Sequence, residues 1–288
     1  MHNASALAVA LLLLSAPGAS GQVGATADAP VVYGHHHLNV RSVDEHRRFW
    51  VDALGGTVVR LGDSPSVVVS FPRVLVFLRE QAPTGGTKGT TVNHVGFQVP
   101  NIRSAVDTLA KAGYPVVTRA ELPPAYTEKD GLAFIPDQNT YVAFVMGPDE
   151  TKVELVENKT MAGAIALHHI HFAAPQIEAM RDWYVKMFGA KAGKRGAFEA
   201  ADLPGVNLTY SGAPAAVVGT KGRVLDHIGF EVKNLQGLVE RFTAMGVIFD
   251  RPFTRIAASG LAIAFFTDPW GTYIELTEGL DSAKSSSR

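Results

Sequence analysis

The sequence predicts an α+β fold in which one strand–helix–strand–strand–strand unit occurs four times. Three observations predict it: four similar strand segments that start at a histidine, a helical pattern after each that ends in glycine, and further strand-like runs after each helix. The strand segments read HHHLNV from His35, HVGFQV from His94, HIHFAA from His169 and HIGFEV from His227. Each alternates with the period of two that is typical of a half-buried strand.

The helices that follow divide the four units into two subtypes. They read VDEHRRFWVDALGG, IRSAVDTLAKAG, IEAMRDWYVKMFG and LQGLVERFTAMG. The closing glycine lies 20 residues after the strand histidine in units one and three, and 19 residues after it in units two and four. Glycine just past the last turn suits the left-handed conformation that caps many helices.

Further strand-like runs complete each unit, for example GTVVRL, SVVVSF and VLVFLRE in the first and VIFDRPF, LAIAFFT and YIELTE in the fourth. The units, called modules 1 to 4 below, span residues 31–81, 92–158, 166–212 and 225–280. We expect consecutive modules to pair, so that residues 31–158 form a first domain and residues 166–280 a second. Module 2 is longer than module 4 by about 12 residues after its glycine, and the excess is expected to form either a loop over the substrate or a simple surface excursion. Tyr126, Lys129 and Tyr141 are the candidate contacts there.

Composition restricts the chemistry that is open to the chain. It has 288 residues, 26 Lys and Arg against 27 Asp and Glu, and no Cys. A net charge of −1 does not favour nucleic acid as a partner. The absence of Cys excludes disulfides, thiolate metal sites and Cys nucleophiles. A small-molecule substrate is the expected partner.

The N-terminal segment is typical of a secretory signal. An apolar run at residues 5–14 is too short to span a bilayer and is followed by the small residues Ala19, Ser20 and Gly21. Residues 1–21 are therefore expected to be a signal peptide, which makes the protein exported, either periplasmic or secreted. No membrane span is expected after its removal.

The repeated H-[VI]-G-F strand starts, the helix-to-glycine spacing and the endings KVELVE and YIELTE resemble the vicinal oxygen chelate superfamily. That superfamily includes glyoxalase I, bleomycin-resistance and fosfomycin-resistance proteins and extradiol dioxygenases. The resemblance implies that paired modules form a cup-shaped sheet around a divalent metal, and hence that the chain holds two such cup-shaped domains. A cup can form within one chain, so a monomer or a homodimer is expected.

The resemblance also implies one set of metal ligands in each domain. The expected sets are His35, His94 and Glu154, and then His169, His227 and Glu275. Two imidazoles and one carboxylate are the ligands of many non-haem iron enzymes, and they also bind other divalent metals. The metal is therefore expected to be Fe, Mn, Ni or Zn.

Two further histidines are candidates for catalysis. His37 and His171 lie two residues after expected ligands, so strand alternation directs them to the same face. Either could be a general base, could support a ligand by a hydrogen bond, could replace its neighbour as the ligand, or could simply pack at the wall of the cup. The family's fourth ligand position aligns with Val76 and Asn207, neither of which can act as the carboxylate base of a glyoxalase.

The sequence thus predicts a metal-dependent enzyme that acts on a small oxygenated organic molecule. The reaction is open between dioxygenation and lyase or isomerase chemistry. Phe265 lies at or next to the position of an extradiol dioxygenase tyrosine, and the neighbouring histidine is missing. The alternative is a protein of the bleomycin-resistance type that binds a small molecule or antibiotic without turnover.

Overall fold

The computed structural model describes residue 26 and residues 28–62, 64–213 and 216–285. The expected signal peptide, residues 1–21, lies outside the described residues and stays a prediction. Among the described residues, no helix has both the length and the apolar character needed to cross a membrane.

Modules 1 and 4 contain the expected elements. Module 1 consists of β1 (Val31–Val40), α1 (Val43–Arg47), its π-helical continuation η1 (Arg48–Ala53), β2 (Thr57–Leu61), β3 (Val67–Phe71) and β4 (Val74–Glu80). Module 4 consists of β14 (Leu225–Val232), α5 (Leu235–Ala244), β15 (Phe249–Arg255), β16 (Ala262–Thr267) and β17 (Tyr273–Glu278), followed by α6 (Leu280–Ala283) and β18 (Lys284–Ser285).

Modules 2 and 3 follow the same plan, and module 2 carries additional short elements. Module 2 consists of β5 (Val92–Val99), α2 (Ile102–Lys111), α3 (Thr118–Glu121), β6 (Glu128–Lys129), β7 (Leu132–Ile135), η2 (Pro136–Gln138), β8 (Thr140–Met146), η3 (Pro148–Glu150) and β9 (Lys152–Glu157). Module 3 consists of β10 (Ala166–Ala174), α4 (Ile177–Phe188), β11 (Lys191–Arg195), β12 (Phe198–Leu203) and β13 (Val206–Gly212).

The closing glycines have the conformation that the sequence predicts. All four adopt a left-handed backbone, with φ of 80°, 90°, 72° and 90° for Gly55, Gly113, Gly189 and Gly246. A residue with a Cβ atom is strained in this region, so glycine ends each helix and turns the chain back towards its sheet.

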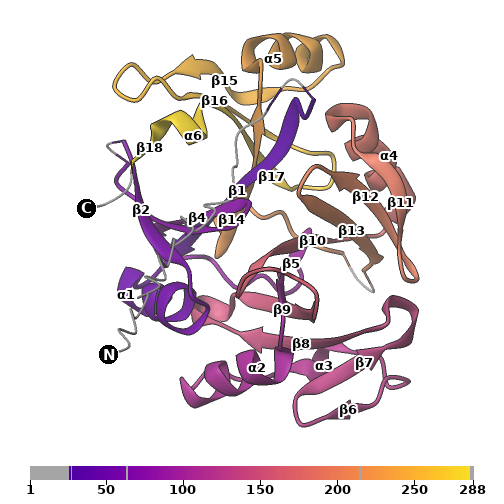
Figure 1. The fold of residues 1–288 in the computed structure, drawn as a ribbon. Helices are drawn as coiled ribbons and strands as arrows, with labels where there is room; N and C mark the ends of the chain where they lie inside the picture. Colours follow the sequence, from indigo (N-terminus) through magenta and orange to yellow (C-terminus); the bar gives the residue numbers. More distant parts are fainter. Residues whose placement is uncertain (1–25, 27, 63, 214–215, 286–288) are drawn as a thin grey trace, which may run out of the picture.

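The strands form two nine-stranded sheets, and the modules pair differently from the prediction. Sheet 1 has the order β15-β16-β17-β14-β1-β4-β3-β2-β18, and sheet 2 the order β11-β12-β13-β10-β5-β9-β8-β7-β6. Module 1 therefore shares a sheet with module 4, and module 2 with module 3. The expected domains at residues 31–158 and 166–280 are wrong in this respect. In Figure 1 the indigo and purple strands of module 1 lie with the orange to yellow strands of module 4.

Consecutive modules are joined through their helical faces instead. The Phe97 ring of β5 lies 6.0 Å from the Trp50 ring of η1. On the other side of the molecule, Phe188 of α4 stacks on Phe230 of β14 at 4.3 Å. One apolar core runs through all four modules. The helix-covered faces of the two sheets are thus buried against each other, and the opposite faces are left to form the two cups.

A buried histidine links modules 1 and 2. His46 of α1 is fully buried, its Nδ1 accepts a hydrogen bond from Trp50 Nε1 at 3.3 Å, and its Nε2 lies 3.2 Å from Asp149 of η3. Burial lowers the pKa of His46 to about 4 although the Asp149 carboxylate opposes the shift. The imidazole is therefore neutral in the folded protein at neutral pH.

Because the buried imidazole of His46 is neutral, we expect the stability of the folded protein to fall in acid. The folded-state pKa of His46 lies below its unfolded value, so its contribution is complete above pH 6.5 and is lost as the pH falls towards 4. We expect a loss of about 3 kcal/mol in the free energy of unfolding at pH 4 from this residue. Urea unfolding of wild type and of His46→Gln between pH 7 and pH 4 would measure it. Parallel pH dependences for the two proteins would contradict the assignment.

Candidate metal centres

In sheet 2, the pairing of β10 with β5 places histidines of module 3 against module 2. The antiparallel register sets His169 opposite Gly96 and His171 opposite His94. A Cβ atom on Gly96 would lie 2.0 Å from Cε1 of His169. The histidine–x–glycine sequence of β5 therefore leaves the space that an imidazole from the partner strand occupies.

Sheet 1 repeats this arrangement with β1 and β14. His35 lies opposite Gly229 and His37 opposite His227. A Cβ atom on Gly229 would again lie 2.0 Å from Cε1 of the opposing ring, here His35. The two module subtypes seen in the sequence are thus complementary partners, one with histidine–x–histidine and one with histidine–x–glycine.

One cluster of side chains that can bind a metal lies in sheet 2 and is called site 2, after its sheet. His94 Nε2 lies 2.8 Å from Glu154 Oε2, and His169 Nε2 lies 3.1 Å from the same oxygen. The two Nε2 atoms are 3.3 Å apart. One ligand atom from each of these residues and from His171, either a ring nitrogen or a carboxylate oxygen, lies within 4.8 Å of the others, and all four residues are buried. Their donor atoms converge on a single point.

The hydrogen bonds around site 2 show that this convergence suits a cation. His94 Nδ1 lies 2.9 Å from Asn93 Oδ1, which can only accept, so Nδ1 carries the proton and Nε2 a lone pair. That lone pair faces the carboxylate of Glu154. Two facing electron pairs repel each other unless a cation lies between them, and a hydrogen-bonded Nδ1 is typical of histidines that bind metal. The residues therefore fit a divalent metal.

Electrostatics at site 2 keep its ligands in the metal-binding state. Although burial alone would raise it, the pKa of Glu154 is held well below its usual value by His169 and by Arg195, whose Nη2 lies 3.3 Å from Glu154 Oε1. Burial lowers the pKa values of His94 and His169. The site thus offers one anionic carboxylate and neutral imidazoles at neutral pH, which is the state that a metal binds.

The second cluster, called site 1, lies in sheet 1 and contains His35, His227 and Glu275. Glu275 Oε2 lies 2.8 Å from His35 Nε2 and 3.0 Å from His227 Nε2. On its other side, His227 Nδ1 lies 2.7 Å from Asp226 Oδ1. Burial opposes protonation of His227, but the hydrogen bonds to Asp226 and Glu275 raise its pKa to about 9. A metal that binds here must first displace this proton.

All six predicted ligands lie in these sites, but the predicted grouping is wrong. Because module 1 pairs with module 4 and module 2 with module 3, His94 and Glu154 meet His169 instead of His35, and His227 and Glu275 meet His35 instead of His169. The two domains expected from the sequence therefore exchange one histidine.

The two candidate catalytic histidines differ in their surroundings. His171 belongs to the site 2 cluster, and its Nε2 lies 2.9 Å from Ser211 Oγ. His37 stacks on Phe77 with ring centroids 5.6 Å apart and lies 4.6 Å from the His227 ring. His171 can therefore serve as a further ligand or as a base, whereas His37 packs at the wall of site 1.

The strand registers correct the fourth ligand position. The residues equivalent to the two glutamates are Thr209 in module 3 and Phe77 in module 1, instead of Asn207 and Val76. Val76 is fully buried in the core. Neither Thr209 nor Phe77 carries a carboxylate, so the expectation that this position lacks a glyoxalase-type base is unchanged.

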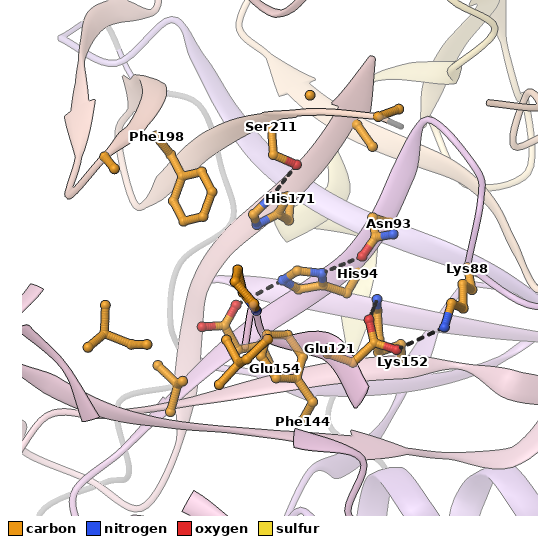
Figure 2. A pocket seen from close by; sticks show the side chains of 18 of the residues that line it. Lys88, Asn93, His94, Glu121, Phe144, Lys152, Glu154, His171, Phe198 and Ser211 are labelled. Carbon is orange, nitrogen blue, oxygen red and sulfur yellow. Dashed lines mark hydrogen bonds and ion pairs between the residues drawn. The ribbon is translucent and has the colours of Figure 1, made fainter. Parts of the chain in front are cut away.

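A cavity of about 790 Å³ opens on site 2. Figure 2 shows His94, Glu154 and His171 at its wall. Apolar side chains supply much of the lining, among them Leu122, Val142, Phe144 and Phe198. A cavity of this size and composition is typical of small-molecule sites.

The additional segment of module 2 contributes to this cavity in part. Tyr126, Ile135 and Gln138 line it. Lys129 and Tyr141, by contrast, are exposed at the surface. Only Tyr126 of the three residues expected to reach the substrate is therefore placed to do so.

The C-terminal segment fills the corresponding space in sheet 1. Leu280 of α6 is 1% exposed and packs with Leu75 and Phe77 on the inner face of the sheet. Glu231 Oε1 accepts hydrogen bonds from the backbone N–H groups of Gly279, at 2.7 Å, and Leu280, at 3.1 Å. Phe77 in turn contacts His35, with ring centroids 5.0 Å apart. Apolar packing thus extends to the edge of site 1.

Sequence reasoning missed five charged residues of the cavity, which are Lys88, Glu121, Asp137, Lys152 and Arg195. Arg195 contacts Glu154, and Lys152 lies 2.5 Å from Glu121. Lys152 precedes Glu154 by two residues on β9, so strand alternation could have placed it on the same face. Arg195 arrives from the edge of sheet 2, and nothing in its local sequence marks it.

Comparison with known proteins agrees with the fold. The chain matches the model of the Glyoxalase/Bleomycin resistance protein/Dioxygenase superfamily over residues 32–129 and 166–276. The chain therefore belongs to this superfamily, as the repeated motifs suggested. A search of curated proteins found no match.

Solved structures share this architecture at low sequence identity. Glyoxalase I from Zea mays superposes with a TM-score of 0.66 and 17% identity, covering 88% of this chain and 94% of the maize chain. A candidate dioxygenase from Bacillus subtilis subsp. subtilis str. 168 superposes with a TM-score of 0.61 and 14% identity, covering 90% of this chain and 86% of the Bacillus chain. At these identities the likeness concerns the fold, and one fold supports many reactions.

Proposed function

We propose that this protein is a metal-dependent enzyme whose reaction takes place at site 2, on a small oxygenated organic substrate. The observation that carries the proposal is the convergence of His94, His169 and Glu154 beside the large cavity, whose wall includes His94 and Glu154. Three protein ligands leave coordination positions open for a substrate. A divalent metal there would act as a Lewis acid towards oxygen atoms of the substrate.

The protein's own residues suit proton transfer beside such a metal. Ser211 Oγ donates to the carbonyl of Phe172 at 3.4 Å, so its lone pair can accept a hydrogen bond from His171 Nε2–H. His171 Nδ1 then carries a lone pair, and it has no hydrogen-bond partner among the described residues. Burial holds the pKa of His171 well below its usual value, so the imidazole is neutral and can act as a proton acceptor for a substrate group that reaches this nitrogen. The arrangement favours isomerase or lyase chemistry over dioxygenation.

Site 1 contributes a second metal position in this proposal. Its ligands match those of site 2, but Leu280 and Phe77 occupy the space beside it. We therefore assign the reaction to site 2, where the cavity gives a substrate access to the ligands.

Metal analysis of purified protein tests the proposal. Wild type loaded with a divalent metal and then dialysed is expected to retain two ions per chain. His94→Ala and His227→Ala should each retain one, because each removes a ligand from a different site. Wild type that retains no metal would contradict the proposal. A turnover that survives His94→Ala and disappears with His227→Ala would place the reaction at site 1.

A binding protein without turnover gives a different result. Such a protein would bind its ligand with unchanged affinity after Glu154→Gln, because its affinity would come from the cavity walls alone. The enzyme proposal requires that this variant loses metal at site 2 and, with it, the metal-dependent part of ligand affinity.

A further inference from the structure

We propose that the substrate of site 2 carries a carboxylate next to the oxygen that the metal binds, and that Arg195 recognises this carboxylate. The class is a 2-oxo or 2-hydroxy acid with an apolar body. This inference rests on the proposed function, because it assumes that the substrate enters the cavity at site 2.

Arg195 is a buried guanidinium with unused donors. Its side chain is 9% exposed and lines the cavity. Its Nη2 lies 3.3 Å from Glu154 Oε1 and its Nη1 3.4 Å from Thr209 Oγ1, both long for hydrogen bonds. Its Nε is buried and has no partner among the described residues. A buried donor without a partner is costly, so the guanidinium is not fully held by its neighbours. A small shift of the side chain towards the cavity would let it bind a carboxylate through two N–H groups.

Arg195 lies beside the position of the superfamily's fourth ligand. Thr209 is the residue of module 3 that corresponds to Glu154 of module 2, and Arg195 contacts both side chains. A threonine and a cation thus replace a carboxylate beside the metal position. The same position in site 1 is taken by Phe77, so no cation enters site 1 in this way.

The charges of the cavity show what is missing. Glu154 pairs with Arg195, and Glu121 is shared between Lys152 and Lys88 at 2.5 Å and 3.4 Å. With Asp137, which also lines the cavity, the acidic and basic side chains of the lining balance. A divalent metal at site 2 would therefore leave an excess of positive charge. An anionic ligand is the simplest group to neutralise it, since unpaired charge is costly in a buried site.

The rest of the lining indicates the body of the substrate. Phe144 lies beside His94 with ring centroids 5.2 Å apart, and Phe198 lies 5.3 Å from the His171 ring. Both rings face the cavity together with Leu122. An aromatic or branched apolar group next to the carboxylate would bury its surface against them.

Matched probes test the inference by direct binding. Co²⁺-loaded protein would be titrated calorimetrically with benzoylformate, a 2-oxo acid with a phenyl group, and with its neutral amide. We expect wild type to bind the acid at least about tenfold more tightly than the amide. Arg195→Met should lower the affinity for the acid by about tenfold to a hundredfold and the affinity for the amide by less than about threefold. Arg195→Lys should restore part of the difference.

Lys194→Met is the matched control. Lys194 precedes Arg195 on β11, and its side chain is 63% exposed and pairs with Glu199. The substitution removes one positive charge from the same strand at a side chain that does not reach the cavity. The affinities for the acid and for the amide should therefore both stay within about threefold of wild type.

The outcomes separate the inference from the proposed function. If Co²⁺ does not bind, both are overturned. If Co²⁺ binds but acid and amide bind equally or not at all, the carboxylate inference fails and the metal site stands. If the preference for the acid is undiminished in Arg195→Met, it comes from the metal alone, and Arg195 has no recognition role.

Discussion

Replacing Glu154 with glutamine is expected to empty site 2 of metal and to destabilise the metal-free protein. The carboxylate is the anionic ligand of the site. Its loss should lower the metal affinity of site 2 by more than the roughly 10–100-fold that follows when a ligand loses its outer hydrogen-bond partner. It also compensates the buried Arg195 at 3.3 Å. Removing one member of a buried ion pair costs about 3–5 kcal/mol.

Two measurements on Glu154→Gln check this expectation. Competition with a chromophoric chelator gives the metal affinity of each site, and urea unfolding of the metal-free protein gives the stability. Glu157→Gln is the control, because Glu157 lies on the same strand and pairs at 3.4 Å with Lys159, whose side chain is 73% exposed. Glu157 Oε1 also accepts a hydrogen bond from the Ile102 N–H at 3.3 Å, which a glutamine oxygen can still accept. The substitution therefore removes only the ion pair with an exposed lysine, which contributes about 0–1 kcal/mol. Equal metal affinity in Glu154→Gln and wild type would remove Glu154 from the ligand set.

Gly96→Ala is expected to have the second large effect, although it adds only one methyl group. Its Cβ would lie 2.0 Å from Cε1 and 2.1 Å from Nδ1 of His169, which is fully buried. The imidazole must leave its position or β5 must separate from β10. We expect loss of metal at site 2 and a loss of about 1–3 kcal/mol in the free energy of unfolding, the usual cost of overpacking.

Matched glycine variants isolate the steric cause. A Cβ on Gly193 of β11 meets nothing within 4 Å, so Gly193→Ala should change neither stability nor metal content. Gly229→Ala should reproduce the effect at site 1 and spare site 2, because its Cβ would meet His35. If Gly96→Ala binds two metal ions per chain, as wild type is expected to, metal binding at site 2 does not depend on the position of His169, and His169 is not a ligand.

The four modules could be predicted because each is encoded by local signals. Period-two strands, helices closed by glycine and turns between the later strands recur at fixed spacing, and the structure confirms these elements. The ligand types could be predicted for the same reason, since His35, His94, His169 and His227 start equivalent strands. The inserted segment of module 2 was placed correctly after Gly113, but which of its residues reach the cavity depends on the local path of the chain.

The charged groups of the cavity were not visible in the sequence. Arg195 contacts Glu154 across 41 residues of chain, and Glu121 contacts Lys152 from an inserted helix. No periodicity connects such residues, because their meeting depends on how strands from different modules are ordered in one sheet. The same holds for Leu280, whose position beside Phe77 follows from the path of the C-terminal segment.

The sequence by itself determined the repeated unit, the side chains that can bind a metal and the complementarity of histidine–x–histidine with histidine–x–glycine strands. Only the tertiary structure decided which strands meet. Pairing consecutive modules would also set each such histidine against a glycine, so local complementarity does not distinguish the two arrangements. The choice depends on contacts between distant segments: Trp50 packs on Phe97 and Phe188 on Phe230, which joins consecutive modules by their helical faces and leaves their first strands to pair elsewhere.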